Sequence, residues 1–170
     1  MQRWQRISSR PLARGYIQVD EDLVRRADGS ELKYEVLRAR GFACACPVTA
    51  EGRVALVRQY RYPLDLVTCE LPAGAIEAGE SPLAAARRET GEETGLGSED
   101  WVELGSFWTM PGRGDERAHL FLARGAVPVE RPPGDEEAEV VFEPIETALR
   151  LLVTVRDVLC LRLAQERLDL

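Results

Sequence analysis

Residues 74–96 read GAIEAGESPLAAARRETGEETGL, an alanine-rich segment that follows a glycine-containing loop and ends in crowded glutamates. The alanine-rich part predicts a helix from about Pro82 to Glu93. Ser81 suits the N-cap, because its hydroxyl accepts a hydrogen bond from the first turn, and proline suits the first helical position. Gly95 follows where a left-handed residue commonly ends a helix.

Three glutamates crowd the last turns of this predicted helix. Glu89 and Glu93 are four residues apart and lie on one face, and Glu92 is three residues from Glu89. Like charges at this spacing repel one another, and the helix dipole disfavours anions at the C-terminal end. Gly91 adds a cost of about 1 kcal/mol. A divalent cation bound by several carboxylate oxygens reverses the repulsion; the alternative is a solvated acidic face.

The remaining pattern indicates strands on both sides of the helix. Alternating or apolar runs predict strands at 16–19, 32–37, 42–48, 54–57, 101–108, 119–123 and 139–142, with a hairpin turn at 27–30. A loop rich in glycine and proline leads into the helix, whose Leu83, Ala86 and Thr90 form a narrow face for close packing. Residues 146–168 have helical periodicity with a break near Thr154. This order favours a mixed α/β layer fold of the α+β class.

Length and charge limit the class of protein. A chain of 170 residues suits one domain, or a core domain with a small extension. The net charge of -7 disfavours nucleic-acid binding, which requires a basic surface. It leaves room for a small anionic substrate, because metals bound by carboxylates invert the local field. No apolar run approaches the ~20 residues that span a bilayer, so we expect no membrane partner.

The N-terminus and the cysteines favour a cytoplasmic location. The basic segment 1–16 has no apolar stretch behind it and so is no secretory signal, with a mitochondrial-type presequence as the alternative. The four cysteines, Cys44, Cys46, Cys69 and Cys160, are too scattered for a disulfide scaffold. With His119 the single histidine, buried reduced thiols are favoured over a zinc site.

The stretch 74–96 resembles the Nudix box, G-x5-E-x7-R-E-U-x-E-E-x-G-U, in which U is aliphatic. The matching residues are in register without a gap: Gly74, Glu80, Arg88, Glu89, Glu92, Glu93, Gly95 and Leu96. Thr90 departs from the pattern, which has a bulky aliphatic residue there, but this removes no ligand. The resemblance implies the Nudix fold, a mixed β-sheet sandwiched between α-helices. It also implies an ion pair between Glu80 and Arg88.

The same resemblance implies hydrolysis of a nucleoside diphosphate linked to another group, with Mg²⁺ or Mn²⁺. It implies Glu89 and Glu93 as metal ligands, Glu92 as an assisting metal and catalytic residue, and the main-chain carbonyl of Ala73 as a further ligand. The chemistry is consistent, because metals neutralise an anionic pyrophosphate, orient the attacking water and stabilise the leaving oxygen.

Sequences around the box resemble the ADP-ribose pyrophosphatase branch. The stretches that carry this are VRQYRYP (57–63), LPAG (71–74) and PGRGDERAHLFLA (111–123), with Pro111 fifteen residues after Leu96. Arg113 departs from the branch, in which an apolar residue is usual. The resemblance favours ADP-ribose as the substrate, cleaved to AMP and ribose 5-phosphate. GDP-mannose or another sugar nucleotide is the alternative within the enzymes.

Substrate binding is assigned to Arg58, Arg61, Pro111 and Glu116. A guanidinium such as that of Arg58 suits phosphate, with a surface salt bridge as the alternative. Glu116 is expected to add a metal or water contact, with a loop ion pair as the alternative. In the branch, a glutamate of the loop corresponding to 135–139 activates the water. This implies Glu136, or next Glu137, as the catalytic base. The alternative is that the acidic run is only a solvated part of the loop.

Domain organisation and partners follow from the branch. Its members carry an N-terminal strand domain that exchanges between subunits. We therefore expect a β extension at 1–40, a Nudix hydrolase domain at 41–170 and a homodimer, with an extension packed on its own subunit as the alternative. A module that binds ADP-ribose without cleaving it is the rival class, but degenerate box carboxylates would mark it, and here they are intact.

Overall fold

The computed structural model describes residues 3–15, 17–130 and 138–168. The chain forms two compact units, one of Met1–Gly41 with Trp108–Arg117 and one of Phe42–Phe107 with Ala118–Leu170. No helix in the described part of the chain has the length and apolar character to cross a membrane.

The first unit contains an antiparallel sheet of β1 (Gln5–Arg14), β2 (Gln18–Arg25) and β3 (Glu31–Arg38), in that order. The predicted turn joins β2 to β3, and there Asp28 Oδ1 accepts from the Ser30 amide at 2.9 Å. Within the same unit, the Leu37 amide of β3 donates to the Arg113 carbonyl at 2.8 Å. β1 was not predicted as a strand of this length, because all its residues are exposed and no alternating face marks it.

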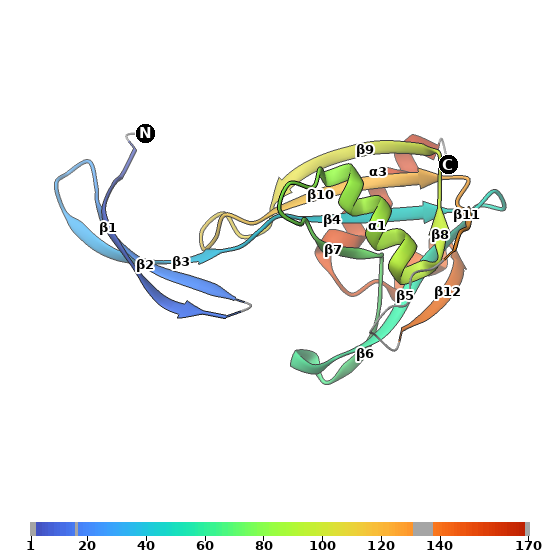
Figure 1. The fold of residues 1–170 in the computed structure, drawn as a ribbon, viewed down its shortest axis with the longest axis horizontal. Coiled ribbons are helices and arrows are strands. Elements are labelled where there is room, and N and C mark those ends of the chain that lie inside the picture. Colours follow the sequence, from blue (N-terminus) through green and yellow to red (C-terminus); the bar gives the residue numbers. More distant parts are fainter. Residues whose placement is uncertain (1–2, 16, 131–137, 169–170) are drawn as a thin grey trace. The chain divides into compact units, whose positions relative to one another are not determined.

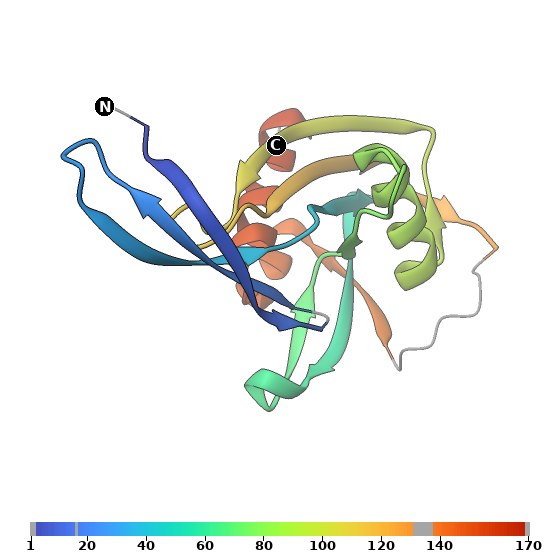
Figure 2. The same ribbon diagram turned by 60° about the vertical axis from the view of Figure 1, so that its left-hand side comes forward.

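The second unit is built on a sheet of the order β12-β5-β4-β10-β9. The bounds are β4 Phe42–Val48, β5 Arg53–Arg61, β9 Asp100–Trp108, β10 Arg117–Arg124 and β12 Glu139–Pro144. β10 runs parallel to β4, whereas β12 and β4 run antiparallel to β5, so the sheet is mixed. β6 (Leu66–Glu70) pairs with β5 around a 3-10 turn at Tyr62–Leu64, and Figure 2 shows the two strands as a hairpin. β7 (Ala73–Ala75) pairs with β4, and β8 (Leu96–Gly97) with β11 (Val127–Pro128).

Helices pack on both faces of this sheet (Figure 1). They are α1 (Pro82–Thr94), α2 (Ile145–Leu151) and α3 (Val155–Leu168). Alternate residues of β4 divide between the faces, since Cys44 and Cys46 pack with α2 and α3, whereas Ala43 and Ala45 pack with α1. The predicted mixed sheet between helices is therefore confirmed.

Local signals define the helix ends as predicted. Ser81 Oγ accepts from the Ala84 amide at 3.2 Å at the start of α1, and Gly95 ends the helix with φ 68°. The predicted break separates α2 from α3, where Thr154 Oγ1 accepts from the Asp157 amide at 3.3 Å. The predicted loop before α1 contains β6 and β7, which a search for alternation misses because both are short.

The cysteines contribute to packing. All four are free thiols, and Cys44, Cys46 and Cys160 are buried whereas Cys69 is partly exposed. Burial raises the pKa of the Cys46 thiol, which keeps it protonated and unreactive.

Candidate functional site

Strand β7 and helix α1 bring the first predicted metal ligand against a glycine. A Cβ on Gly74 would lie 2.0 Å from Glu89 Oε1, so the glycine leaves the space that this carboxylate occupies. Gly74 has no left-handed backbone to explain it. The glycine that opens the box is therefore required by the close approach of Glu89 to the backbone of β7.

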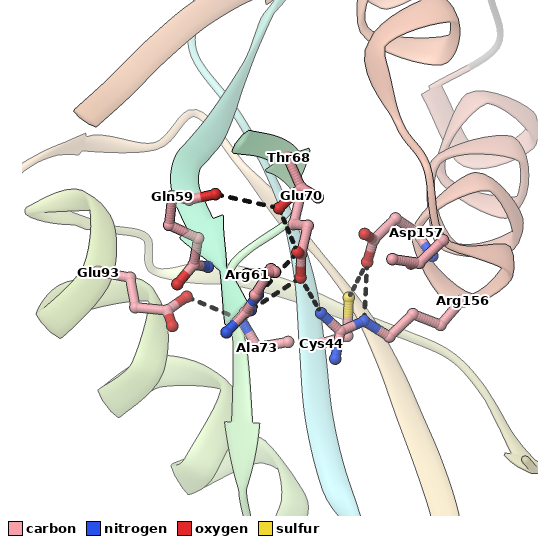
Figure 3. Close-up of polar contacts among 10 residues, drawn as sticks. Cys44, Gln59, Arg61, Thr68, Glu70, Ala73, Glu93, Arg156 and Asp157 are labelled. Carbon is pink, nitrogen blue, oxygen red and sulfur yellow. Dashed lines mark hydrogen bonds and ion pairs between the residues drawn. The ribbon is translucent and has the colours of Figure 1, made fainter. Parts of the chain in front are cut away.

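Glu93, the second predicted metal ligand, binds Ala73, the residue before Gly74. Glu93 Oε2 accepts a hydrogen bond from the Ala73 amide at 2.9 Å, as Figure 3 shows. Glu89 and Glu93 thus reach adjacent residues of β7 from one face of α1, and that common face is what their four-residue spacing predicts. The structure brings Glu93 to Ala73, whose carbonyl is the predicted additional ligand, and Glu89 to the neighbouring Gly74.

Arg88 connects the remaining box carboxylates. Its Nε and Nη2 donate to the two oxygens of Glu80, both at 3.0 Å, so the predicted ion pair is confirmed. Its Nη1 also donates to Glu89 Oε1 at 2.7 Å and to Glu92 Oε2 at 3.1 Å. The bond from Arg88 lowers the pKa of Glu80 below its usual value. One arginine therefore balances part of the negative charge of three glutamates.

The electrostatics of Glu89 differ from those of an ordinary surface carboxylate. Its burial is the largest cause of a raised pKa, and the charges of Glu92 and Glu80 raise it further, while Arg88 acts in the opposite direction. The ionised form of Glu89 is thus destabilised, and a cation near this carboxylate would stabilise it.

The donor set fits a hard divalent cation. Carboxylate and main-chain carbonyl oxygens are the donors that Mg²⁺ and Mn²⁺ prefer. In the described part of the chain, no three His, Cys, Asp or Glu side chains are already gathered around one point for a metal. Glu89 Oε1 and Glu92 Oε2 instead accept from Arg88, and each carboxylate has further lone pairs with which to bind a cation.

Arg61, a predicted substrate-binding residue, belongs to a partly buried ionic network (Figure 3). Its Nε and Nη2 donate to the two oxygens of Glu70 at 2.9 and 2.8 Å. Arg156 Nη2 donates to Glu70 Oε2 at 2.8 Å, and Arg156 Nε donates to Asp157 Oδ1 at 3.0 Å. Sequence reasoning missed Glu70, Arg156 and Asp157; the available signal was an acidic residue placed directly before LPAG in an apolar run.

Two other predicted substrate residues, Arg58 and Glu116, bind neighbouring side chains. Arg58 Nη1 donates to Glu139 Oε2 at 2.8 Å across β5 and β12, which is the salt bridge given as its alternative. Pro111 and Glu116 belong to the unit that contains the N-terminal strands, where Glu116 Oε2 accepts from the Thr109 hydroxyl at 2.9 Å. Glu136 and Glu137, the predicted catalytic bases, lie outside the described residues.

A pocket of about 450 Å³ is lined by other residues. Arg87 of α1 extends over the Trp101 ring, 5.9 Å from its centroid, and the other lining residues include Arg124, Gly97 of β8 and Val127 of β11. None of the predicted site residues that the structure describes lines it.

Comparison with known proteins identifies the family. The NUDIX domain model matches residues 37–163. Over 128 residues the chain is 37% identical to the ADP-ribose pyrophosphatase of Bacillus subtilis (strain 168), covering 74% of this chain and 69% of that protein. Over 125 residues it is 40% identical to the methanol dehydrogenase activator of Bacillus methanolicus, covering 74% of this chain and 66% of that protein. The chain thus spans about two thirds of these relatives' length.

A mammalian relative and a solved structure agree with this. Over 98 residues the chain is 56% identical to the ADP-sugar pyrophosphatase of Mus musculus, covering 54% of this chain and 45% of that protein. A crystal structure of an ADP compounds hydrolase superposes with a TM-score of 0.88 at 23% identity, covering 99% of this chain and 96% of that chain. The predicted Nudix fold is confirmed, and the chain belongs to the NUDIX domain family.

Proposed function

We propose that this chain is a Nudix hydrolase that cleaves the pyrophosphate of a nucleoside diphosphate sugar, with ADP-ribose as its main substrate. AMP and ribose 5-phosphate are the products. The observation that carries the proposal is the arrangement of Glu89 and Glu93 against adjacent residues of β7, with all box carboxylates intact. Relatives named ADP-ribose pyrophosphatase and ADP-sugar pyrophosphatase support the same substrate class.

Mg²⁺ is the metal we assign, with Mn²⁺ as a substitute. Glu89 and Glu93 would hold it, with Glu92 assisting and the Ala73 carbonyl as a further donor. When bound, the metal supplies neutralisation of the pyrophosphate charge and polarisation of the phosphoryl oxygen. Without it the substrate would meet the negative charge of these glutamates, which Arg88 balances only in part, and so we expect no turnover in a chelator.

The remaining residues bind and orient the substrate in this proposal. Arg61 and Arg58 meet phosphate oxygens, since a planar guanidinium fork matches their geometry. Pro111 and Glu116 are also assigned to substrate binding, as the sequence predicts. Glu136, or next Glu137, removes the proton from the attacking water.

The organisation of the whole protein is also a proposal. We assign an N-terminal β extension to residues 1–40 and the hydrolase domain to 41–170. The extension is exchanged between the subunits of a homodimer. The enzyme is placed in the cytoplasm, where its thiols stay reduced, and has no nucleic-acid or membrane partner.

A substrate panel tests the proposal. ADP-ribose, GDP-mannose, UDP-glucose, NADH and diadenosine polyphosphates are each incubated with the purified full chain and Mg²⁺, and the products are identified by chromatography. We expect the fastest cleavage for ADP-ribose, with AMP as a product. Glu93→Gln should lose about 10²–10³-fold or more in kcat, because a metal ligand stabilises developing charge. Glu103→Gln, an exposed residue of β9, is the matched control and should keep full activity.

Two results would contradict the proposal in different ways. Faster cleavage of GDP-mannose than of ADP-ribose would show that the main substrate is another sugar nucleotide. Tight binding of ADP-ribose without cleavage in Mg²⁺ or Mn²⁺ would make the chain a binding module.

A further inference from the structure

Glu70 is a buried residue, 4% exposed, and each of its two carboxylate oxygens accepts two hydrogen bonds. Oε1 accepts from the Thr68 hydroxyl at 2.6 Å and from Arg61 Nε at 2.9 Å. Oε2 accepts from Arg61 Nη2 and from Arg156 Nη2, both at 2.8 Å. Burial acts to raise the pKa of Glu70, but the bonds from Arg61 and Thr68 outweigh it and hold the pKa below its usual value. Glu70 is therefore an ionised anchor for two guanidinium groups.

The contact with Arg61 fixes more than a distance. Two parallel N–H···O bonds along the Nε–Nη2 edge set the plane of the guanidinium, which a single bond does not do. The plane in which the other N–H groups of Arg61 lie is consequently fixed. The Arg61 side chain is 36% exposed, whereas that of Glu70 is 5% exposed, so the arginine extends outward from a buried base.

Arg156, which is 86 positions from Glu70 in the sequence, binds the same carboxylate. It lies in the first turn of α3, and its guanidinium is placed 5.3 Å from the centroid of the Phe42 ring. Its Nε donates at 3.0 Å to Asp157 Oδ1, and the Asp157 side chain is completely buried. Glu70 is thus prevented from rotating with Arg61, because a second cation, itself fixed by Asp157, binds the same oxygen.

Glu70 lies shortly before the proposed metal site along the chain, but its side chain binds Arg61, Thr68 and Arg156. Glu70 ends β6, and Leu71 and Pro72, both buried, separate it from Ala73, whose amide binds Glu93. β6 pairs with β5, with Val57 opposite Glu70 and Arg61 opposite Leu66. Glu70 and Arg61 therefore lie on paired strands, and any movement of the Glu70 carboxylate would disturb Arg61 through the two hydrogen bonds between them.

We propose that Glu70 and Arg156 are positioning residues, which fix the Arg61 guanidinium in the orientation that receives a substrate phosphate. The inference rests on the proposed function, because it requires Arg61 to bind phosphate. Neither residue touches the substrate in this scheme. Their contribution is preorganisation: Arg61 does not have to be ordered when the pyrophosphate binds.

The test compares Glu70→Gln, Arg61→Lys and the double variant in the full-length protein with ADP-ribose and Mg²⁺. Glutamine keeps the shape of Glu70 but replaces one acceptor by an amide donor, which faces the arginine donors. We expect Glu70→Gln to lower kcat/KM by about 10–100-fold, as for other supporting residues around a site. The larger part of the loss should be a rise in KM.

Two further readouts separate positioning from a general structural effect. If Glu70 acts through Arg61, the double variant should be no worse than Arg61→Lys alone, since coupled residues are not additive. The Mg²⁺ concentration for half-maximal activity should be unchanged, because Glu70 holds the arginine and not the metal. Arg156→Lys keeps the charge, loses the bond to Asp157 and should show a smaller rise in KM; it decides the question if Glu70→Gln does not fold.

Each outcome is decisive. Activity of Glu70→Gln and Arg156→Lys equal to that of the Glu103→Gln control would overturn the positioning role alone. Losses that multiply in the double variant, or a shift in the Mg²⁺ requirement, would overturn it as well. An inactive wild-type chain would refute the proposed function first, and the positioning role with it, and is recognised from the wild-type assay itself.

Discussion

Gly74→Ala is the substitution with the most specific expected effect. The new Cβ would lie 2.0 Å from Oε1, 2.1 Å from Cδ and 2.4 Å from Oε2 of Glu89, so the whole carboxylate must move by about 1 Å or more to reach van der Waals contact. The clash involves the end of a flexible side chain and not backbone, and Gly74 has an ordinary φ. The fold should therefore survive while a proposed metal ligand is displaced.

The magnitude follows from that displacement. A misplacement of about 1 Å in a catalytic site costs about 10²-fold in rate, so kcat/KM for ADP-ribose should fall by about 10²-fold or more. Removal of a glycine from a permissive backbone contributes about 0.4–1 kcal/mol of stability, which offsets part of the strain. The melting temperature should consequently change by only a few degrees, since about 1 kcal/mol corresponds to about 2–4 °C for a chain of this size.

Gly91→Ala is the matched control, because nothing lies within 4 Å of its Cβ position in α1. It should keep full activity and stabilise the protein by up to about 1 kcal/mol. The assay is steady-state hydrolysis with a Mg²⁺ titration, together with thermal unfolding of both variants. Wild-type kcat/KM and Mg²⁺ dependence in Gly74→Ala would refute the assignment of Glu89 to the metal site.

Three more predictions concern stability and substrate contacts. The pKa of Glu70 is held below its usual value of 4.5 in the folded protein, so its stabilising contribution is complete above that pH and is lost as the pH falls through the lower folded-state pKa. Acid unfolding followed by circular dichroism should show a weaker pH dependence in Glu70→Gln, and an identical dependence would contradict this. Thr90→Leu should destabilise the protein by about 1–3 kcal/mol in urea unfolding through overpacking, because Thr90 is fully buried, whereas Thr90→Val should cost less than Leu; a stabilised Leu variant would show spare room beside α1. Arg58→Ala should change stability by less than about 1 kcal/mol, because its ion pair with Glu139 is exposed, yet it should raise KM for ADP-ribose, and an unchanged KM would leave Arg58 as a salt bridge alone.

Local chemistry made α1 and the common face of its glutamates predictable. The cap at Ser81, the left-handed Gly95 and the common face of Glu89 and Glu93 all depend on residues within a few positions of one another. The resemblance to the Nudix box added the ion pair of Glu80 with Arg88, which the structure confirms. The break between α2 and α3 was predictable for the same reason, since Thr154 lies beside it.

Features that depend on distant residues were not predictable. Glu70 and Arg156 are 86 positions apart, and no pattern in either segment indicates that they meet. The need for glycine at position 74 depends on Glu89 folding back over β7, which spacing alone does not specify. β1 is exposed along its length, and β6 and β7 are short, so none of them carries the alternation that identifies a strand.

The most direct test is the binding of Mn²⁺ to the substrate-free protein, followed by the loss of the free-ion electron paramagnetic resonance signal. Wild-type protein should bind the ion, and Glu89→Gln and Glu93→Gln should each bind it at least about 10-fold more weakly, with Glu103→Gln unchanged. Equal affinity in all four proteins, or hydrolysis of ADP-ribose that persists in excess EDTA, would contradict a divalent cation held by the carboxylates of α1.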